Sequence, residues 1–461
     1  MKPLTPATDL ARRAFLRRSL WLGATGAAAP LALNLSLLAD AVAATAPGDY
    51  KALVCVFLYG GNDHGNTLVP VDATHYAQYA AIRGAAATAQ SALSATALTP
   101  AQALPDGLQY ALAPQLAPLK SVWDAGRLAV QLNVGPLIVP TTVAQYQARS
   151  VPLPPKLMSH NDQQSIWQSD LAEGATSGWG GRMGDLMLST NGGSVFTCTS
   201  VTGNAVFLSG QTAVQYQIGT SGAVAIKALQ KPLFGAASAQ SALRNLITAP
   251  SSHLMADEYA RVTRRSIDAE AQVTSALAGV PELATDFPDT SLGAQLEMVA
   301  RMVAARGSLG LSRQVFLVSL GGFDLHDNLV ENHPGLLTQV GDALRAFYDA
   351  TVELGVSGQV TTFTASDFGR TLSINGDGSD HGWGGVHVVL GGGVNGRAYY
   401  GTAPAVAVSG PDDIGQGRLV PTTSVDQFGA TLARWLGVSD TDIATVMPNV
   451  GNFNARYLGF V

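Results

Sequence analysis

Five short apolar runs, rich in β-branched residues and separated by helical stretches, limit the fold of this chain more than any other feature of its sequence. Several runs end in or near glycine-rich turns, and they cover residues 52–58, 128–134, 315–320, 360–364 and 386–390. Runs of this length and composition are typical of buried strands. Helical periodicity marks residues 252–278, residues 292–305, and a helix with four apolar residues on one face, Leu337, Val340, Leu344 and Phe347. Strands that alternate with helices predict a layered α/β domain with a mainly parallel sheet.

Size and charge narrow the class of protein further. The chain has 461 residues, of which 47% are hydrophobic and 13% charged, so it is long enough for a large α/β core. Its formal net charge is −6, and it becomes about −9 without residues 1–43, which carry a surplus of basic side chains. Such an acidic chain is not expected to bind a nucleic-acid backbone. After that segment no stretch is apolar over the roughly 20 positions that a membrane helix needs, so we expect no membrane span in the mature form.

The N-terminal segment resembles a twin-arginine export signal rather than part of the fold. The paired Arg12 and Arg13 precede an apolar stretch over residues 20–38, and a small-residue cleavage pattern follows at residues 41–43. We therefore predict a periplasmic or secreted protein that meets the twin-arginine translocase, with a signal peptide over residues 1–43 and one domain with surface insertions over residues 44–461. An uncleaved membrane anchor is the alternative, against which the Ala and Gly content of the apolar stretch argues.

Three other features carry no readable chemistry. Residues 85–103 are rich in Ala, Thr and Gln, and we expect them to form a surface insertion. Residues 136–155 form a proline-rich connection, which we expect to be too rigid for a strand and too broken for a helix. Cys55 and Cys198 are too few for a disulfide scaffold and do not have the spacing of a zinc or haem site. Whether the two thiols form one disulfide stays open.

Acidic and histidine residues gather directly after three of the expected strands. In open parallel sheets the loops after the strands converge on one edge, where ligands bind. The first strand leads into Gly60-Gly61-Asn62-Asp63-His64, and the third leads into Gly321-Gly322-Phe323-Asp324-Leu325-His326. The fourth leads into Ser366-Asp367-Phe368-Gly369-Arg370 and then Ser379-Asp380-His381, with His387 just beyond. We therefore expect these carboxylates and imidazoles to lie close together in the fold.

The mixture of ligand types indicates a metal centre. Carboxylates together with imidazoles suit zinc, manganese or iron, whereas an all-oxygen set favours magnesium or calcium. A single Asp-His pair is weak evidence, because a turn-capping Asp beside a surface His gives the same pattern. The combination is stronger, because four of the eight histidines of the chain fall in or just beyond these three loops.

A fourth segment, Ser159-His160-Asn161-Asp162, follows the proline-rich connection and opens a helical stretch. In one interpretation Ser159 is the N-cap of a helix with Asp162 in its first turn. In the other it is a nucleophile, because the helix N-terminus favours an anion and a neighbouring cation lowers the pKa of the hydroxyl. The sequence leaves both interpretations open.

These motifs are similar to those of the exported bacterial family catalogued as domain of unknown function 1501, a branch of the alkaline-phosphatase-like superfamily. The similarity covers nearly the whole mature chain. It is carried by GGNDHGNTLVP at residues 60–70, SHNDQQSIW at 159–167, GGFDLHDN at 321–328, SDFGRT at 366–371 and SDHGWGG at 379–385.

The resemblance implies a three-layer α/β/α sandwich with a mainly parallel, mixed central sheet and a two-metal site for the transfer of phosphate or sulfate esters. Zinc is the expected ion, with manganese, magnesium and iron as alternatives. Carried over by motif, the first position is formed by Asp63, Ser159, Asp380 and His381, and the second by Asp324, His326 and His387. Ser159 and Arg370 are the expected catalytic residues. Two such cations roughly 4 Å apart can stabilise the attacking and leaving oxygens together.

The chain departs from the superfamily pattern at three points. Asp324 and His326 are separated by one residue where three are usual, which makes His333 an alternative to His326. His387 follows His381 more closely than the usual final histidine. The Cys-x-Pro-x-Arg motif of sulfatases is absent from the sequence, so Ser159 would be an ordinary alkoxide nucleophile.

Three functions follow as hypotheses, and the third, an envelope structural or carbohydrate-binding protein, is favoured if the purified protein contains no metal. The first is an exported, metal-dependent hydrolase or transferase that acts on a small or polymeric anionic ester. The second is a non-catalytic metal- or anion-binding envelope protein on the same scaffold, since a fold does not establish an activity.

Overall fold

The five predicted strands all form, and each has nearly the predicted bounds. The computed structural model describes residues 49–232 and 235–461, so the predicted signal peptide lies outside the described residues. The strands are β1 (Lys51–Leu58), β4 (Leu128–Gly135), β8 (Arg313–Leu320), β9 (Val360–Ser366) and β12 (Gly385–Leu390). The predicted helices also form, as α9 (Leu254–Ala278), α10 (Ser291–Ala304) and α11 (Leu329–Glu353).

These strands belong to one large mixed sheet. Its order is β13-β4-β12-β9-β1-β8-β5-β6-β7, with β14 beside β4. The five added strands are short: β5 (Cys198–Ser200), β6 (Tyr216–Gly219), β7 (Gly222–Ala223), β13 (Ala398–Tyr400) and β14 (Thr423–Ser424). β1 is parallel to both of its neighbours, β8 and β9, whereas β12 is antiparallel to β9 and β4. The prediction of a mainly parallel, mixed sheet is confirmed.

The register brings the ends of the three central strands level. Leu58, the last residue of β1, pairs with Leu320 at the end of β8 and with Ser366 at the end of β9. Because all three strands are parallel, the three loops that follow them start side by side at the same edge of the sheet. This edge carries the candidate site.

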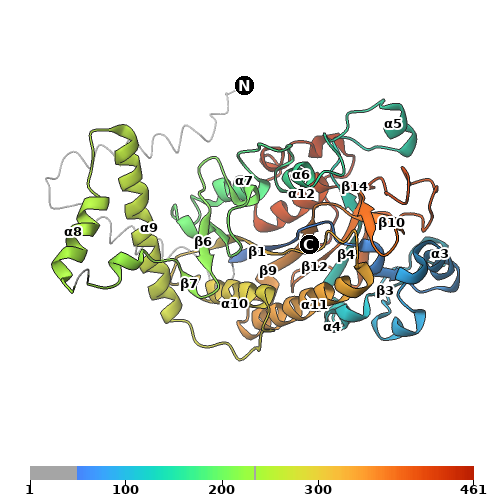
Figure 1. The fold of residues 1–461 in the computed structure, drawn as a ribbon, viewed down its shortest axis with the longest axis horizontal. Coiled ribbons are helices and arrows are strands. Elements are labelled where there is room, and N and C mark those ends of the chain that lie inside the picture. The colour runs from blue at the N-terminus through green and yellow to red at the C-terminus, as the bar shows by residue number, and fades with distance from the viewer. Residues whose placement is uncertain (1–48, 233–234) are drawn as a thin grey trace, which may run out of the picture. The chain divides into compact units, whose positions relative to one another are not determined.

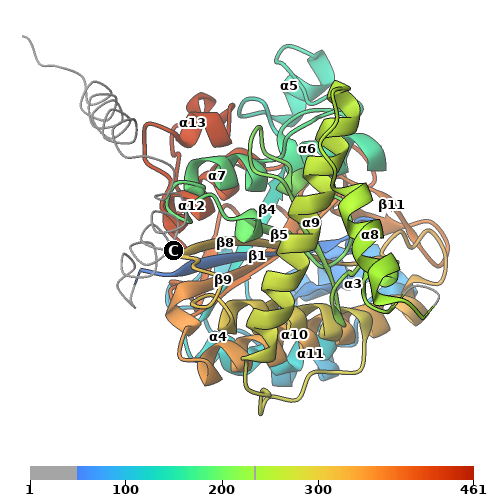
Figure 2. The same ribbon diagram turned by 90° about the vertical axis from the view of Figure 1, so that its left-hand side faces the viewer.

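Helices cover both faces of the sheet, which confirms the three-layer arrangement (Figures 1 and 2). One layer contains α10, α11 and α4 (Ala117–Asp124), and the other contains α6 (His160–Ser169), α7 (Trp179–Met187), α12 (Val425–Leu436) and α13 (Ile443–Val446). The two cores follow the alternation of side chains along each strand. In β1, Val54 and Val56 point into the first core, whereas Leu53, Cys55 and Phe57 point into the second.

The proline-rich connection differs from the prediction, because it contains a short helix, α5 (Val143–Ala148). Thr142 accepts a bond from the backbone of Gln145, whose side chain in turn accepts one from the backbone of Thr142. This capping box stabilises a single helical stretch between the prolines, so the prediction that no helix forms there was wrong.

The remaining elements lie around this framework. Helix α3 (Ala73–Arg83) follows β2 (Leu68–Pro70), which pairs with β3 (Tyr110–Leu112). The low-complexity residues 85–103 form short 3-10 turns, among which Leu93 and Leu98 are buried. A hairpin of β10 (Arg370–Ile374) and β11 (Ser379–His381) follows β9, and α8 (Ala237–Ile247) precedes α9.

The sequence left open whether Cys55 and Cys198 form a disulfide. Cys55 and Cys198 are both free and buried, and burial raises the pKa of each thiol above its ordinary range. Of the helices in residues 49–232 and 235–461, none is both long and apolar enough to cross a membrane.

Candidate metal centre

Four side chains from three separate parts of the fold meet at the edge where the central strands end. Asp324 and His326 lie in the loop after β8, His381 closes β11, and His160 is the first residue of α6. Gly60, in the loop after β1, has a φ of +117°, and a Cβ there would collide with the backbone nitrogen of Asp324. This glycine therefore allows the loops after β1 and β8 to approach each other closely.

The Nε2 atoms of the three histidines converge on the Asp324 carboxylate. The Nε2 of His381 lies 3.0 Å from that of His160 and 2.9 Å from that of His326. Oδ1 of Asp324 is 3.2 Å from His381 Nε2 and 3.0 Å from His326 Nε2, and Oδ2 is 3.3 Å from His160 Nε2. All four side chains are partly open to solvent. Within the described ranges, His160, Asp324 and His381 form the one group of at least three such residues whose ligand atoms all lie within 4.8 Å of one another.

The other ring nitrogens fix which atoms face the centre. His381 Nδ1 lies 2.7 Å from the carbonyl oxygen of Met158, which can only accept, so Nδ1 carries the proton. His160 Nδ1 lies 2.6 Å from Oδ2 of Asp367, and His326 Nδ1 lies 3.3 Å from Oδ1 of Asp380. When Nδ1 is the donor, the Nε2 of a neutral ring holds a lone pair. The centre is thus a set of acceptor atoms about 3 Å apart, an arrangement that a cation between them would stabilise.

This donor set fits a divalent transition metal. Three imidazoles and one carboxylate are ligands that zinc takes at roughly 2.0–2.2 Å, which for a tetrahedral site places neighbouring donor atoms a little over 3 Å apart. Metal-binding histidines almost always donate their second N–H to a carboxylate or a carbonyl. His160, His326 and His381 each place Nδ1 against such an oxygen.

Arg370 and Asp367 are both fully buried and contact residues of the centre. Arg370 Nη1 donates to Oδ1 of Asp324 and to the carbonyl of Gly60, at 3.0 Å in each case. Asp367 accepts hydrogen bonds from Gln164 Nε2 at 2.6 Å and from the backbone of Gly60 at 3.2 Å. The two residues therefore tie the loops after β1, β8 and β9 together.

The pKa shifts of the groups at the centre differ in direction and cause. The hydrogen bond with Asp367 raises the pKa of His160 against the opposing effect of burial. Desolvation by burial lowers the pKa of His381, as do the charges of His160 and Arg370. For Asp324, partial burial favours the neutral acid, but the hydrogen bond from Arg370 and the nearby histidines outweigh it and lower the pKa. The lowered pKa values favour a deprotonated Asp324 and a neutral His381, which are the forms that bind a cation.

The structure brings together three of the predicted ligands and places a fourth behind them. Asp324, His326 and His381 form the centre with His160. Asp380 contacts the outer nitrogen of His326 and accepts a bond from Asn375 at 2.8 Å. In this structure it therefore lies against the outer side of the His326 ring instead of facing the centre.

Ser159 lies beside the centre as the residue before His160. It occupies the N-cap position of α6, but its side chain makes no capping bond to the backbone. Its Oγ donates instead to Oδ2 of Asp162, a buried carboxylate, at 3.0 Å. The structure therefore does not support the N-cap interpretation of this side chain.

Asp63 and His387 lie in other surroundings. Asp63 is buried in an ion pair with Arg83 of α3, which lowers its pKa against the effect of burial. His387 is buried within β12, where Nδ1 lies 3.2 Å from Thr364 Oγ1 and the ring packs edge-on against Trp167. Burial lowers the pKa of His387 to about 3. The resemblance to the superfamily predicted both residues as metal ligands. Among the described residues, neither contacts His160, His326 or His381.

His326 and His333, the two alternatives for one ligand, lie in different surroundings. His333 is buried in α11 with its Nε2 3.0 Å from Oδ1 of Asn62, and burial lowers its pKa to about 4. His326 lies at the centre.

His160 of the centre and Asp367, which contacts its outer nitrogen, were not assigned from the sequence. The sequence offered an indication of each, because Asp367 follows an expected strand and His160 adjoins Ser159 in one of the family motifs. His160 was missed because its segment follows no strand.

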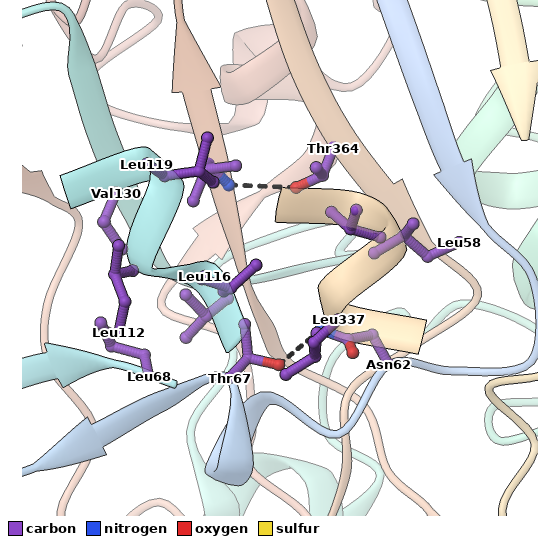
Figure 3. Close-up of a pocket in the computed structure, with 13 residues that line it drawn as sticks. Leu58, Asn62, Thr67, Leu68, Leu112, Leu116, Leu119, Val130, Leu337 and Thr364 are labelled. Carbon is purple, nitrogen blue, oxygen red and sulfur yellow. Dashed lines mark hydrogen bonds between the residues drawn. The ribbon is translucent and has the colours of Figure 1, made fainter. Parts of the chain in front are cut away.

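Small interior cavities lie away from the centre. One of about 20 Å³ lies between the sheet and α4 and α11, next to the Asn62–Thr67 hydrogen bond (Figure 3). Another of about 40 Å³ lies beside His64 and Tyr79. Ligand pockets usually measure about 300–1,000 Å³, so these cavities have room for water but not for a substrate.

The sequence profile of the family described as "Protein of unknown function (DUF1501)" matches residues 50–448. The chain belongs to this family. The match spans all the residues of the centre, from the loop after β1 to the β10–β11 hairpin. A comparison with curated proteins gave no match for this DUF1501 chain.

Three solved structures with partial backbone similarity to this chain have low sequence identity to it. The lipoteichoic acid synthase LtaP from Listeria monocytogenes is 9% identical, with 88% of this chain and 78% of that chain covered and a TM-score of 0.34. Ps i-CgsB, solved with k-i-k-neocarrahexaose, is 9% identical, with 88% and 77% covered and a TM-score of 0.36. PsFucS1 sulfatase from Pseudoalteromonas sp. is 10% identical, with 85% and 68% covered and a TM-score of 0.34.

Proposed function

We propose that this protein is an exported, metal-dependent hydrolase or transferase that acts on phosphate or sulfate esters. The observation that carries the proposal is the convergence of three histidine Nε2 atoms and a carboxylate at the exposed end of the central strands. The ester class comes from the resemblance of the five motifs to the alkaline-phosphatase-like superfamily.

His160, Asp324, His326 and His381 would hold one divalent ion, with zinc as the expected metal. When bound, the ion supplies a Lewis acid that stabilises negative charge on the ester oxygens. Asp367, Asp380 and the carbonyl of Met158 orient the three rings, and Arg370 orients Asp324. Asp63 and His387 have no part in this set, so the proposal requires a single ion.

Ser159 is the proposed nucleophile. Its Oγ adjoins the His160 ligand in sequence, and its proton already points to the carboxylate of Asp162. Asp162 is held in turn by Lys156, with Nζ at 3.6 Å, so an acceptor for the serine proton is in place. Because α6 begins at His160, the free backbone N–H groups of its first turn favour an anionic group beside Ser159.

Arg418 is the proposed contact for the anionic substrate. Its Nε donates to the carbonyl of His381 at 2.8 Å, and its Nη2 lies 4.0 Å from Asp380. The side chain keeps 24% of its surface exposed beside the centre. An anchored and partly exposed guanidinium matches the geometry of phosphate and sulfate oxygens.

The experiment is metal analysis of the exported protein followed by assays with aryl phosphate and aryl sulfate esters. We expect close to one metal equivalent per chain and turnover that chelation abolishes and the same metal restores. The variant His381→Ala should lose both metal and turnover, whereas His253→Ala, which removes an exposed imidazole preceding α9, should change neither. A metal-free wild-type protein would refute the metal centre.

The alternative function, a non-catalytic metal- or anion-binding envelope protein, makes a different prediction. It is compatible with a bound metal and with its loss in His381→Ala, but it requires that no ester in a broad panel is turned over. The exposed position of the centre is compatible with either function, so turnover decides between them.

A further inference from the structure

Helix α9 carries an apolar stripe along nearly its whole length. Starting at Met255, positions separated alternately by four and three residues are occupied by Tyr259, Val262, Ser266, Ala269, Val273 and Ala276. The average spacing of 3.5 residues is that of a coiled-coil seam, in which one helix packs along another.

The two halves of this stripe have opposite surroundings. Ala269, Val273 and Ala276 are buried in the main core, which also includes Tyr216 of β6 and Ala223 of β7 at its border. Met255 and Tyr259, in contrast, are 71% and 70% exposed, and Val262 is 39% exposed. Figure 1 shows this first half of α9, with α8, standing clear of the helices that flank the sheet.

The neighbouring helix does not cover the exposed half. Ala260 and Ile267 are buried on another side of α9, whereas the stripe stays open although α8 contacts α9. Leu246 of α8 and Leu254 at the start of α9 are also exposed, by 74% and 76%. A row of large apolar side chains at regular helical spacing, all uncovered, marks a surface that packs against a partner.

The charges beside the stripe are complementary to those of a second copy of the chain. Glu258 and Arg265 directly precede the seam positions 259 and 266, so they lie seven residues apart on the same flank. When two α9 helices pair antiparallel about a twofold axis, Glu258 of one copy faces Arg265 of the other, and the pair occurs twice. Arg261 of the same helix contacts Glu258 at 2.7 Å, but such an exposed pair is weak and can exchange.

We propose that the first half of α9 is a homodimerisation surface, in which two copies form an antiparallel helix pair with Val262 at its centre, Tyr259 on either side of it and Met255 at the ends. The contact spans about four helical turns. It is therefore at the small end of specific interfaces, below about 1,200 Å² in total, and we expect a dimer that dissociates on dilution.

The test is sedimentation of the purified, exported protein over a range of concentrations. We expect a monomer–dimer equilibrium that Tyr259→Asp shifts at least tenfold towards monomer. Ala271→Asp adds the same charge to an exposed position of α9 away from the stripe and should leave the equilibrium unchanged. Ester turnover at the metal centre should be the same in both variants.

Charge exchange gives the sharper test of the antiparallel arrangement. Glu258→Arg alone and Arg265→Glu alone should each weaken the dimer, and the double variant should restore it. A wild-type protein that stays monomeric at its highest soluble concentration would overturn the proposal. So would a dimer that Tyr259→Asp leaves intact, or a monomer that binds to phospholipid vesicles through this surface. Failure of the double variant to restore the dimer would exclude the antiparallel pairing proposed here.

Discussion

The Nδ1 atom of His160 lies 2.6 Å from Oδ2 of Asp367, a fully buried carboxylate 207 residues away in the sequence. This contact fixes the orientation of the ring whose other nitrogen faces the centre, and it connects helix α6 to the end of strand β9. The convergence of the candidate ligands therefore depends on the docking of a helix from one layer against the edge of the sheet.

Replacing Asp367 by Asn should weaken metal binding by roughly 10- to 100-fold, as is usual when the residue that orients a metal-binding histidine is changed. The amide can still occupy the space, but it no longer favours the N–H donor at His160 Nδ1. Metal affinity is measured by competition with a chromophoric chelator. Asp327→Asn is the matched control, because this carboxylate follows His326 but is exposed. Equal affinities in both variants would contradict the proposed role of Asp367.

The buried pair of Asp63 and Arg83 predicts a stability effect without loss of metal. Asp63→Asn leaves the Arg83 guanidinium buried without its counter-charge, which should cost about 3–5 kcal/mol of unfolding free energy. Asp124→Asn breaks an exposed pair with Lys120 and should cost no more than about 1 kcal/mol. Denaturant unfolding and metal analysis are done on the same preparations. If the Asp63 variant keeps its stability and loses the metal, Asp63 is a ligand after all.

Much of the fold could be predicted because buried strands and amphipathic helices have different periods. The apolar runs at β1, β8 and β9 each predicted a strand. The convergence of Asp324, His326 and His381 follows because these three strands are parallel and end at the same level. The register that makes them level joins residues about 260 and 310 positions apart, and no local pattern encodes it.

Asp63, His387 and His160 show that a sequence motif does not specify where a side chain points in the fold. Asp63 follows β1 as expected, but a 3-10 turn (His64–Asn66) begins directly after it, and the carboxylate meets Arg83 from α3. His387 follows His381 closely in the sequence but lies within β12, where the alternation of side chains along the strand directs it towards Trp167. His160 reaches the centre from a helix, and only the packing of α6 on the sheet brings it there.

Three buried histidines predict a loss of stability at mildly acidic pH. Burial lowers the pKa of His387 to about 3 and those of His64 and His333 to about 4, below the ordinary value of 6.5. Between these values the unfolded chain binds protons that the folded chain excludes. The stabilising effect of a neutral, buried ring is therefore complete above about pH 6.5 and is lost as the pH falls.

For His387 this effect can be isolated by the variant His387→Gln. Its unfolding free energy should fall less steeply with decreasing pH than that of the wild type, by about 1.4 kcal/mol per pH unit between pH 6 and 4. Asp426, whose pKa is raised by burial to about 6, adds a slope of opposite sign, but it is present in both proteins. Denaturant unfolding at several pH values gives the difference. Parallel curves would show that His387 takes up a proton in the folded state.

Export is predicted from Arg12 and Arg13, which precede the apolar segment. The double variant Arg12→Lys, Arg13→Lys should leave the precursor in the cytoplasm, because the twin-arginine translocase requires the pair. Fractionation and immunoblotting measure the distribution. A variant with Lys2→Arg controls for a conservative change in the same basic region, and normal export of the double variant would contradict the assigned route.

The most demanding prediction concerns Ser159. Its side chain makes no capping bond in the structure, so Ser159→Ala should lose less than the roughly 1 kcal/mol that removal of an N-cap usually costs. As the nucleophile it should nevertheless lower ester turnover by several orders of magnitude, while the metal stays bound by the three histidines and Asp324. Ser165→Ala is a matched control, because this serine of the same helix donates to the carbonyl of Ala172 away from the centre. Metal content, melting temperature and turnover are measured together for the wild type and both variants. Unchanged turnover in metal-loaded Ser159→Ala would exclude this serine and leave water as the attacking group.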